Sequence, residues 1–161
     1  MNPNHFHGKH VIPLPVEDVF SFFEAPANLE RLTPPWLKFA ILTPPPIAMR
    51  EGAIIDYAIR LHGVPMHWKT LITRYEPPHG FVDEQLSGPY AMWRHEHRFE
   101  EIEGGTRIVD DVYYVLSWGL LGRAAHRLFV RRDVARIFDY RQKAIEGVFR
   151  AAHSHQERVP A

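Results

Sequence analysis

The chain has 161 residues, with 19 basic and 19 acidic side chains and no cysteine. This charge balance does not favour nucleic-acid binding, and the lack of cysteine excludes disulfides, thiol catalysis and cysteine-ligated zinc or iron–sulfur sites. No apolar run approaches the roughly 18 residues of a membrane-spanning helix, and the first ten residues lack the apolar core of a signal peptide. We therefore expect one cytoplasmic domain over residues 1–152 and a frayed polar tail over residues 153–161.

The N-terminal part of the chain predicts a strand followed by short helical segments. Residues 5–12 alternate in polarity, and Pro15 then marks the start of a helix with acidic residues in its first turn. Residues 27–32 predict a second short helical segment. The proline-rich residues 33–37 leave the helix, and residues 38–42 predict another strand.

Residues 53–76 predict a hairpin with one inward face. Apolar and polar side chains alternate on both sides of a reversal at Gly63-Val-Pro. The inward positions of its two strands are Ile55, Tyr57, Ile59, Leu61, Met66, Trp68, Thr70 and Ile72. A second reversal at residues 77–80 leads into the next pair of strands.

Residues 81–99 predict two strands joined by a turn at Gly88-Pro89. In the second strand the charged side chains share one face, which belongs in water, because strand side chains alternate between faces. The opposite, inward face consists of Trp93, His95, His97 and Phe99. Two imidazoles are therefore expected among large aromatic rings inside the domain.

The first strand of this pair is harder to orient, because neither of its faces is purely apolar. If Phe81 points inward, then Asp83 and Gln85 do as well. A carboxylate, an amide and two imidazoles would then share the interior. Buried polar groups need partners, so this cluster is either a self-satisfied network or the polar lining of a cavity.

The last two elements complete the predicted fold. Residues 107–116 predict a strand, and the proline-free residues 122–150 carry apolar side chains at helical spacing. One side of the strand consists of Ile108, Asp110, Val112 and Tyr114. The element order indicates an α+β domain in which a curved antiparallel sheet wraps around a long C-terminal helix, with one or two short helices after the first strand.

Four motifs are spaced along the chain: GVPMHWKT from Gly63, FVDEQ from Phe81 with Gly88-Pro89 after it, WRHEHRF from Trp93, and FDYR from Phe138. Together they resemble the START-like, helix-grip superfamily, also called SRPBCC, which includes birch-pollen-allergen proteins and polyketide cyclases. The chain is most similar to small, bacterial, stand-alone ligand-binding members. Related domains are sometimes fused to epimerase-like modules, so the resemblance also suggests an epimerase-like partner protein.

The resemblance implies a cavity between the sheet and the long helix that binds a small hydrophobic molecule, such as a lipid, a quinone or a polyketide-like aromatic. No cofactor and no metal are predicted. The predicted ligand-binding residues are Tyr57, Trp68, Asp83, Gln85, Trp93, His95, His97, Asp110, Tyr114 and Phe138. The alternative is a cyclase- or dehydratase-type enzyme whose candidate catalytic residues are His95, His97 and Asp83. A third interpretation is an interaction domain that acts on a dehydrogenase-like partner.

The two inward histidines have further interpretations. They can be core residues hydrogen-bonded to Asp83, Gln85 or the backbone. With Asp83 or Asp110 they can also form a two-histidine, one-carboxylate metal site, although this spacing on a strand is common without a metal. No nucleophile motif accompanies them.

An apolar loop from Trp118 to Gly122 precedes a basic stripe on the predicted helix, formed by Arg123, Arg127, Arg131 and Arg132. The stripe is interpreted as a solvated helix face. Together, loop and stripe are suited to transient contact with a membrane surface while a lipid enters the cavity. The glycines at both ends of the loop also suit a gate.

Overall fold

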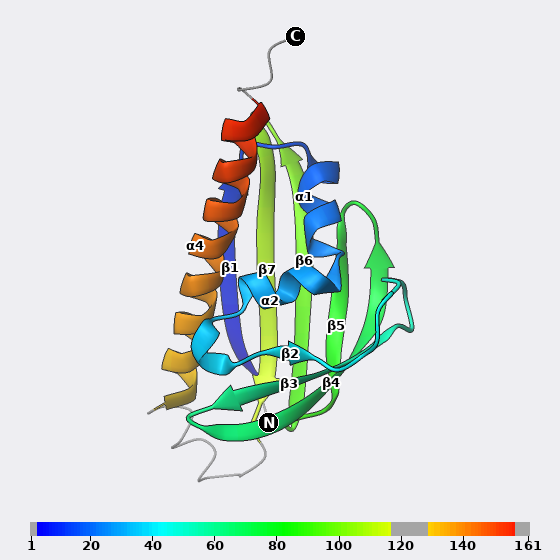
Figure 1. The fold of residues 1–161 in the computed structure, drawn as a ribbon, viewed down its shortest axis with the longest axis vertical. Helices are drawn as coiled ribbons and strands as arrows, with labels where there is room; N and C mark the ends of the chain where they lie inside the picture. The colour runs from blue at the N-terminus through cyan, green and yellow to red at the C-terminus, as the bar shows by residue number, and fades with distance from the viewer. Residues whose placement is uncertain (1–2, 117–128, 157–161) are drawn as a thin grey trace.

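The computed structural model describes residues 3–116 and 129–156, which form one seven-stranded antiparallel sheet and the helices that cover it (Figure 1). The order of strands across the sheet is β1-β7-β6-β5-β4-β3-β2. In chain order the elements are β1 (Asn4–Ile12), α1 (Val16–Phe23), α2 (Leu29–Leu32), β2 (Ala40–Ile41), β3 (Ile54–Leu61), β4 (Val64–Glu76), β5 (Gly80–Ser87), β6 (Met92–Ile102), β7 (Gly105–Val115) and α4 (Arg131–Gln156). The predicted α+β helix-grip fold is confirmed.

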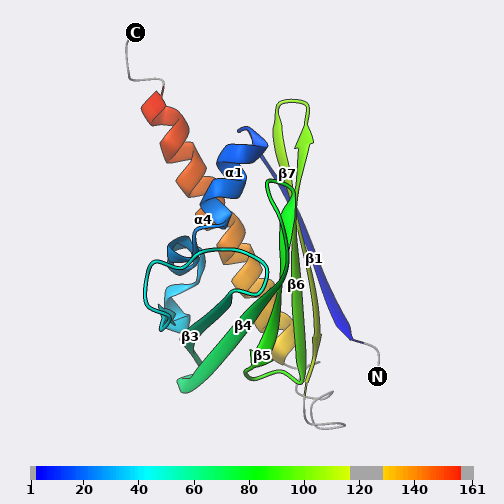
Figure 2. The ribbon, with the colours of Figure 1, turned by 90° about the vertical axis from the view of Figure 1, so that its right-hand side faces the viewer.

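The sheet is curved and carries its helices on one face. Figure 2 shows α1 and α4 on the same side of the sheet, with β3 and β4 curling round beneath them. This arrangement follows from the sequence, because an antiparallel sheet with one apolar face must cover that face, and the amphipathic α1 and α4 are the elements able to do so. The space between the sheet and α4 is therefore the interior of the domain.

Two apolar clusters fill most of this interior. The larger one packs α1 and the C-terminal half of α4 against the sheet, and its centre includes Phe20, Phe99, Ile108 and Ile145. The smaller one packs the N-terminal half of α4 against β7 and consists of Val112, Tyr114, Val134 and Phe138, with neighbours that include Trp93. The inward positions predicted along β4 and β6 are confirmed, since Trp68, Ile72, His95, His97 and Phe99 are all buried.

Two short segments differ from the sequence prediction. Residues 33–37 were expected to leave the helix, and α2 does end at Leu32, but Pro35–Leu37 then forms a 3₁₀ turn. A proline at the first position of a turn loses no hydrogen bond, which explains why a proline-rich segment still coils. The strand predicted over residues 38–42 is only Ala40–Ile41 long.

The long helix α4 also ends later than predicted. It continues to Gln156, four residues into the segment expected to fray from residue 153 onward, because nothing in residues 151–156 is a helix breaker. The predicted loop at Trp118–Gly122, together with Arg123 and Arg127, lies outside the described residues. Within the two described ranges, no helix is long and apolar enough to cross a membrane.

Gly80 lets β5 and β6 approach closely at the start of the hairpin that carries the inward histidines. A Cβ atom at this position would lie 2.3 Å from the carbonyl oxygen of His97, and backbone atoms in the middle of a sheet cannot move away freely. We expect Gly80→Ala to destabilise the fold by about 1–3 kcal/mol in urea unfolding. Gly147→Ala is the control: no atom would meet its Cβ, so the helix should gain up to about 1 kcal/mol. Equal effects of the two variants would contradict this account.

Candidate functional site

A cavity of about 190 Å³ lies between the inner face of the sheet, the α1–α2 segment and α4. Most of its wall is apolar, because the inward positions of β3, β4 and β5 meet the apolar side of α4 there. Its apolar lining includes Phe22, Phe23, Leu32, Ile55, Ile59, Leu61, Val134, Ile137 and Phe138. The polar part of the lining includes Thr70, Asp83, His95, His97 and Arg141.

The strand register brings the polar residues together. Asp83 on β5 lies directly opposite His95 on β6, and His97 lies directly opposite Asp110 on β7. All four side chains point to the inner face. A cluster of two carboxylates and two imidazoles, here called the His–Asp cluster, therefore spans three neighbouring strands.

Asp110 joins the two histidines. Its Oδ1 atom lies 2.9 Å from Nε2 of His95, in a hydrogen bond, and 3.0 Å from Nδ1 of His97. The second contact is electrostatic, since His97 Nδ1 is not directed along a hydrogen bond. On the cavity side, Asp83 Oδ2 lies 3.1 Å from His97 Nε2 and 3.7 Å from His95 Nδ1. Each carboxylate thus forms a hydrogen bond with one imidazole, while His97 Nδ1 has no hydrogen-bond partner among the described residues.

The two imidazoles differ in their affinity for a proton. Burial, together with the neighbouring imidazole of His97, lowers the pKa of His95 to about 4, so this ring is neutral at pH 7. Burial also disfavours charge on His97, but its contacts with Asp110 and Asp83 outweigh this effect and raise its pKa above the usual value. Burial alone would raise the pKa of both carboxyl groups, but the imidazoles hold the pKa of Asp83 low and that of Asp110 well below its usual range.

Arg141 on α4 is a cavity residue that the site prediction omitted. Its guanidinium carbon lies 5.6 Å from the ring centre of Phe23 and 6.0 Å from that of Phe138. Its Nε has no hydrogen-bond partner among the described residues. The positive charge reaches the His–Asp cluster, because it helps to lower the pKa of both Asp83 and Asp110. The sequence contained one signal for Arg141: it lies three residues after Phe138, so both side chains are on one face of the helix, and Phe138 was predicted to line the cavity.

Aromatic side chains form another part of the cavity wall. Trp68 stacks on Tyr57 at a centroid distance of 5.8 Å and meets Trp93 edge-on at 5.3 Å. The Nε1 atom of Trp68 is buried and, within the described part of the chain, has no hydrogen-bond partner. Burial raises the pKa of Tyr57, so its phenol stays protonated.

The structure places the predicted ligand-binding residues in two groups. Seven of them line the cavity: Tyr57, Trp68, Asp83, Trp93, His95, His97 and Phe138. The other three lie elsewhere. Asp110 is behind the imidazoles, beside a separate void of about 40 Å³. Gln85 donates to the carbonyl of Tyr90 at 2.7 Å and accepts from its amide, so it stabilises the 87–91 loop. Tyr114 packs in the smaller apolar cluster.

The ligand atoms of Asp83, His95 and His97 all lie within 4.8 Å of one another, which is close enough for one metal ion. Asp110 does not belong to that set. The hydrogen bonds and electrostatic contacts within the His–Asp cluster account for this spacing.

Residues 12–139 match the family model described as polyketide cyclase / dehydrase and lipid transport. The chain belongs to this family. Its members include binders of hydrophobic ligands and aromatase/cyclases. No curated protein sequence matches the chain significantly.

Solved structures show the same fold. The chain is similar to the ZhuI aromatase/cyclase from Streptomyces sp. R1128, with a TM-score of 0.73 and 17% identity. The match covers 92% of this chain and 94% of the ZhuI chain. The protein TTHA0849 from Thermus thermophilus gives a TM-score of 0.69 at 19% identity, over 92% of this chain and 99% of that one. The nucleoside-diphosphate sugar epimerase from Corynebacterium glutamicum is 26% identical with a TM-score of 0.60; the match covers 87% of this family member but only 28% of the epimerase chain.

The low pKa of His95 makes the stability of this family member depend on pH. The unfolded imidazole takes up a proton near pH 6.5, whereas the folded one resists protonation down to about pH 4, so stability is lost as the pH falls through this window. His95→Gln has no imidazole at this position, so it does not lose stability in this way. From pH 7 to pH 5 we expect wild type to lose about 2 kcal/mol more than His95→Gln in urea unfolding.

The exposed His79 offers the control, since His79→Gln should follow the wild-type pH profile. Parallel profiles of wild type and His95→Gln would show that His95 is not held neutral by burial.

Proposed function

We propose that this protein binds a small, uncharged hydrophobic molecule in the cavity between the sheet and α4. The observation that carries the proposal is the cavity itself, whose wall is mostly apolar and includes the polar side chains of Asp83, His95, His97 and Arg141. Such a combination, an apolar pocket with a few convergent polar groups, is typical of ligand sites. The family includes binders of hydrophobic ligands, which supports this interpretation.

The volume of the cavity restricts the size of the ligand. At about 190 Å³ it is smaller than the roughly 300–1,000 Å³ of pockets for drug-sized molecules. It is slightly larger than an apolar cavity of about 150 Å³ that binds benzene. A molecule of one or two aromatic rings, or a short aliphatic chain, therefore fits without rearrangement of the wall.

The charges around the cavity favour an uncharged ligand. Asp83 and Asp110 are ionised, Arg141 is positive, His95 is neutral at pH 7, and the raised pKa of His97 shifts this imidazole towards its charged form. A buried ion without a partner costs several kcal/mol, so an anionic or cationic guest would disturb a wall that is already balanced. The polar groups can instead orient a neutral ligand through hydrogen bonds.

Filling the cavity tests the proposal. Ile59 lines the cavity from β3, whereas Ile54 on the same strand is 47% exposed to solvent. With 2-naphthol as the probe, we expect Ile59→Trp to weaken binding at least tenfold in isothermal titration calorimetry, because the larger ring occupies the ligand volume. Ile54→Trp is the matched control and should bind as wild type does.

Equal affinities of the two tryptophan variants, or no binding of any uncharged one- or two-ring probe to wild type, would refute the proposal. Native mass spectrometry of protein purified without denaturation would identify a ligand that copurifies.

A second candidate function is catalysis of a dehydration, favoured by a proton donor and a proton acceptor bordering one cavity. For a β-hydroxy ketone, the imidazolium of His97 would give its proton to the hydroxyl oxygen as the C–O bond breaks. The carboxylate of Asp83 would accept the proton from the α-carbon as the C=C bond forms, so that water and an enone result. In the structure the two groups are hydrogen-bonded to each other at 3.1 Å, so a substrate would have to replace this hydrogen bond.

Turnover and affinity distinguish an enzyme from a carrier. With 4-hydroxy-4-phenylbutan-2-one, an enzyme would produce the enone, followed by its ultraviolet absorbance, and His97→Gln would lower kcat by about 100-fold or more while the Kd changes less than threefold. A carrier would bind the ketone without turnover. Activity retained by His97→Gln would exclude the proposed role of His97.

A further inference from the structure

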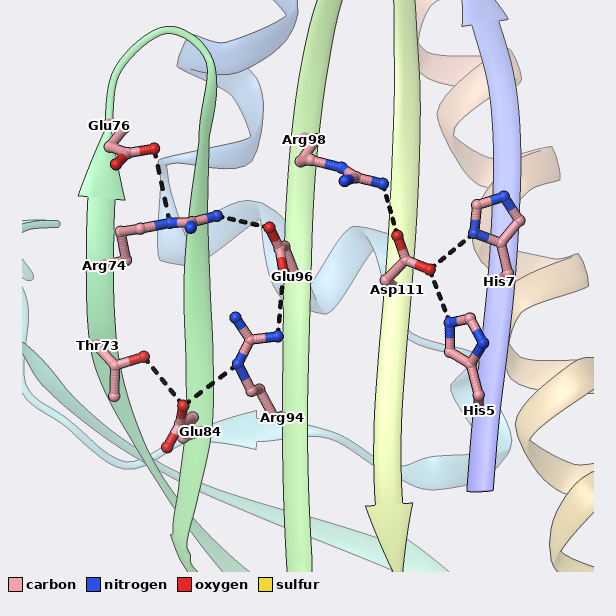
Figure 3. Close-up of polar contacts among 10 residues, drawn as sticks. All are labelled: His5, His7, Thr73, Arg74, Glu76, Glu84, Arg94, Glu96, Arg98 and Asp111. Carbon is pink, nitrogen blue, oxygen red and sulfur yellow. Dashed lines mark hydrogen bonds and ion pairs between the residues drawn. The ribbon is translucent and has the colours of Figure 1, made fainter. Parts of the chain in front are cut away.

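Figure 3 shows two separate polar networks on the outer face of the sheet, opposite the helices. In the first network, guanidinium nitrogens of Arg74 and Arg94 lie 2.6 and 3.0 Å from the carboxylate oxygens of Glu96. These are ordinary ion pairs. The second is centred on Asp111 of β7. Two imidazoles from the edge strand β1 converge there on a single carboxylate oxygen.

The geometry of the second network is that of a three-ligand set. His5 Nε2 and His7 Nδ1 each lie 2.7 Å from Asp111 Oδ1, and the three potential ligand atoms lie within 4.8 Å of one another. His7 is directly opposite Asp111 across the β1–β7 pair, and His5 is two residues away on the same face of β1. The side chains of His5 and His7 are 42% and 41% exposed, so an ion from solution can reach them.

Neighbouring residues hold these side chains in place. Arg98 donates to the other oxygen of Asp111, Oδ2, at 2.7 Å, which fixes the plane of a carboxylate that is only 9% exposed. The ring of His5 stacks on Tyr113 at a centroid distance of 4.4 Å and an angle of 6°. Support of this kind, behind the ligands, is what orients side chains in metal sites.

We propose that His5, His7 and Asp111 bind a divalent transition-metal ion, of which Zn²⁺ is the representative. Two imidazole nitrogens and one carboxylate oxygen suit Zn²⁺, Cu²⁺ or Ni²⁺ rather than Mg²⁺ or Ca²⁺, which prefer oxygen ligands. Solvent would complete the coordination. The site is independent of the cavity, because it lies on the opposite face of the sheet.

Binding requires only a small local change. Ligand atoms around tetrahedral Zn²⁺, with bonds of about 2.0–2.1 Å, are separated by about 3.3 Å, so the two nitrogen–oxygen distances must widen by about half an ångström. The exposed imidazoles can rotate to achieve this. A ring nitrogen that donates its proton to Asp111 must release that proton before it can bind the metal, and the tautomer with the proton on the other ring nitrogen provides for this.

The metal would fasten the edge strand β1 to β7. Since the ligand set exists only when the two strands are paired, the ion binds the folded state and stabilises it. With protein free of any histidine tag, we expect titration with ZnCl₂ to show one site and, at 100 times the Kd, a rise in Tm of about 5–10 °C. MgCl₂ should leave the Tm unchanged.

Variants locate the site. We expect His5→Ala and His7→Ala each to weaken Zn²⁺ binding at least tenfold and, at the same ZnCl₂ concentration, to cut the rise in Tm to about half or less, while both exposed substitutions should leave the fold intact in EDTA. His67→Ala is the matched control, because His67 is exposed and lies 3.2 Å from a carboxylate oxygen of Asp56, but among the described residues it belongs to no group of three potential metal ligands. It should bind Zn²⁺ as wild type does.

Electron paramagnetic resonance with one equivalent of Cu²⁺ gives a direct readout, in which two nitrogen ligands are expected. The proposal is overturned if wild type binds Zn²⁺ no more tightly than the His5→Ala/His7→Ala double variant. It is also overturned if His97→Gln, rather than the β1 variants, removes binding, since the metal would then occupy the His–Asp cluster.

Discussion

One buried carboxylate, that of Asp110, determines how the interior of this domain is arranged. It contacts both imidazoles of β6, and Asp83 completes the group from the other side. Phe81 stacks on His97 at 4.2 Å and Phe138 meets His95 edge-on at 5.5 Å, so the polar group lies between the two apolar clusters. The cavity adjoins the same polar group. A ligand in it would contact apolar side chains on most sides and hydrogen-bonding groups on one.

Much of this arrangement could be predicted from the sequence, because strand periodicity is a local property. The charged residues that alternate with His95 and His97 leave no other face for the imidazoles, and the same reasoning places Asp110 on the inner side of β7. Asp83 could not be placed with the same certainty, since both faces of β5 mix polar and apolar residues. Its orientation depends on the register with β6, which is a long-range property of the sheet.

The positions of Gln85 and Arg141 and the volume of the cavity depend on tertiary packing, which the periodicity of the sequence does not determine. Gln85 follows the inward alternation of β5, yet the irregular pairing of β4 with β5 near Ser87 leaves its amide beside the backbone of Tyr90. Arg141 lies on a helix with many charged residues, and only the packing of α4 shows which of them reaches the cavity. Cavity volume is likewise a small difference between large packed volumes, so no pattern of residue types predicts it.

The His–Asp cluster draws one side chain from each of β5 and β7 and two from β6, and this distribution affects folding as well as ligand chemistry. If β6 slipped by one residue, Arg94, Glu96 and Arg98 would be forced into the apolar interior while both imidazoles turned towards solvent. Asp83 and Asp110 would then lose their histidine partners and three more charged side chains would be buried, at a cost of several kcal/mol. The cluster therefore also favours the native register of β6 over one shifted by a single residue.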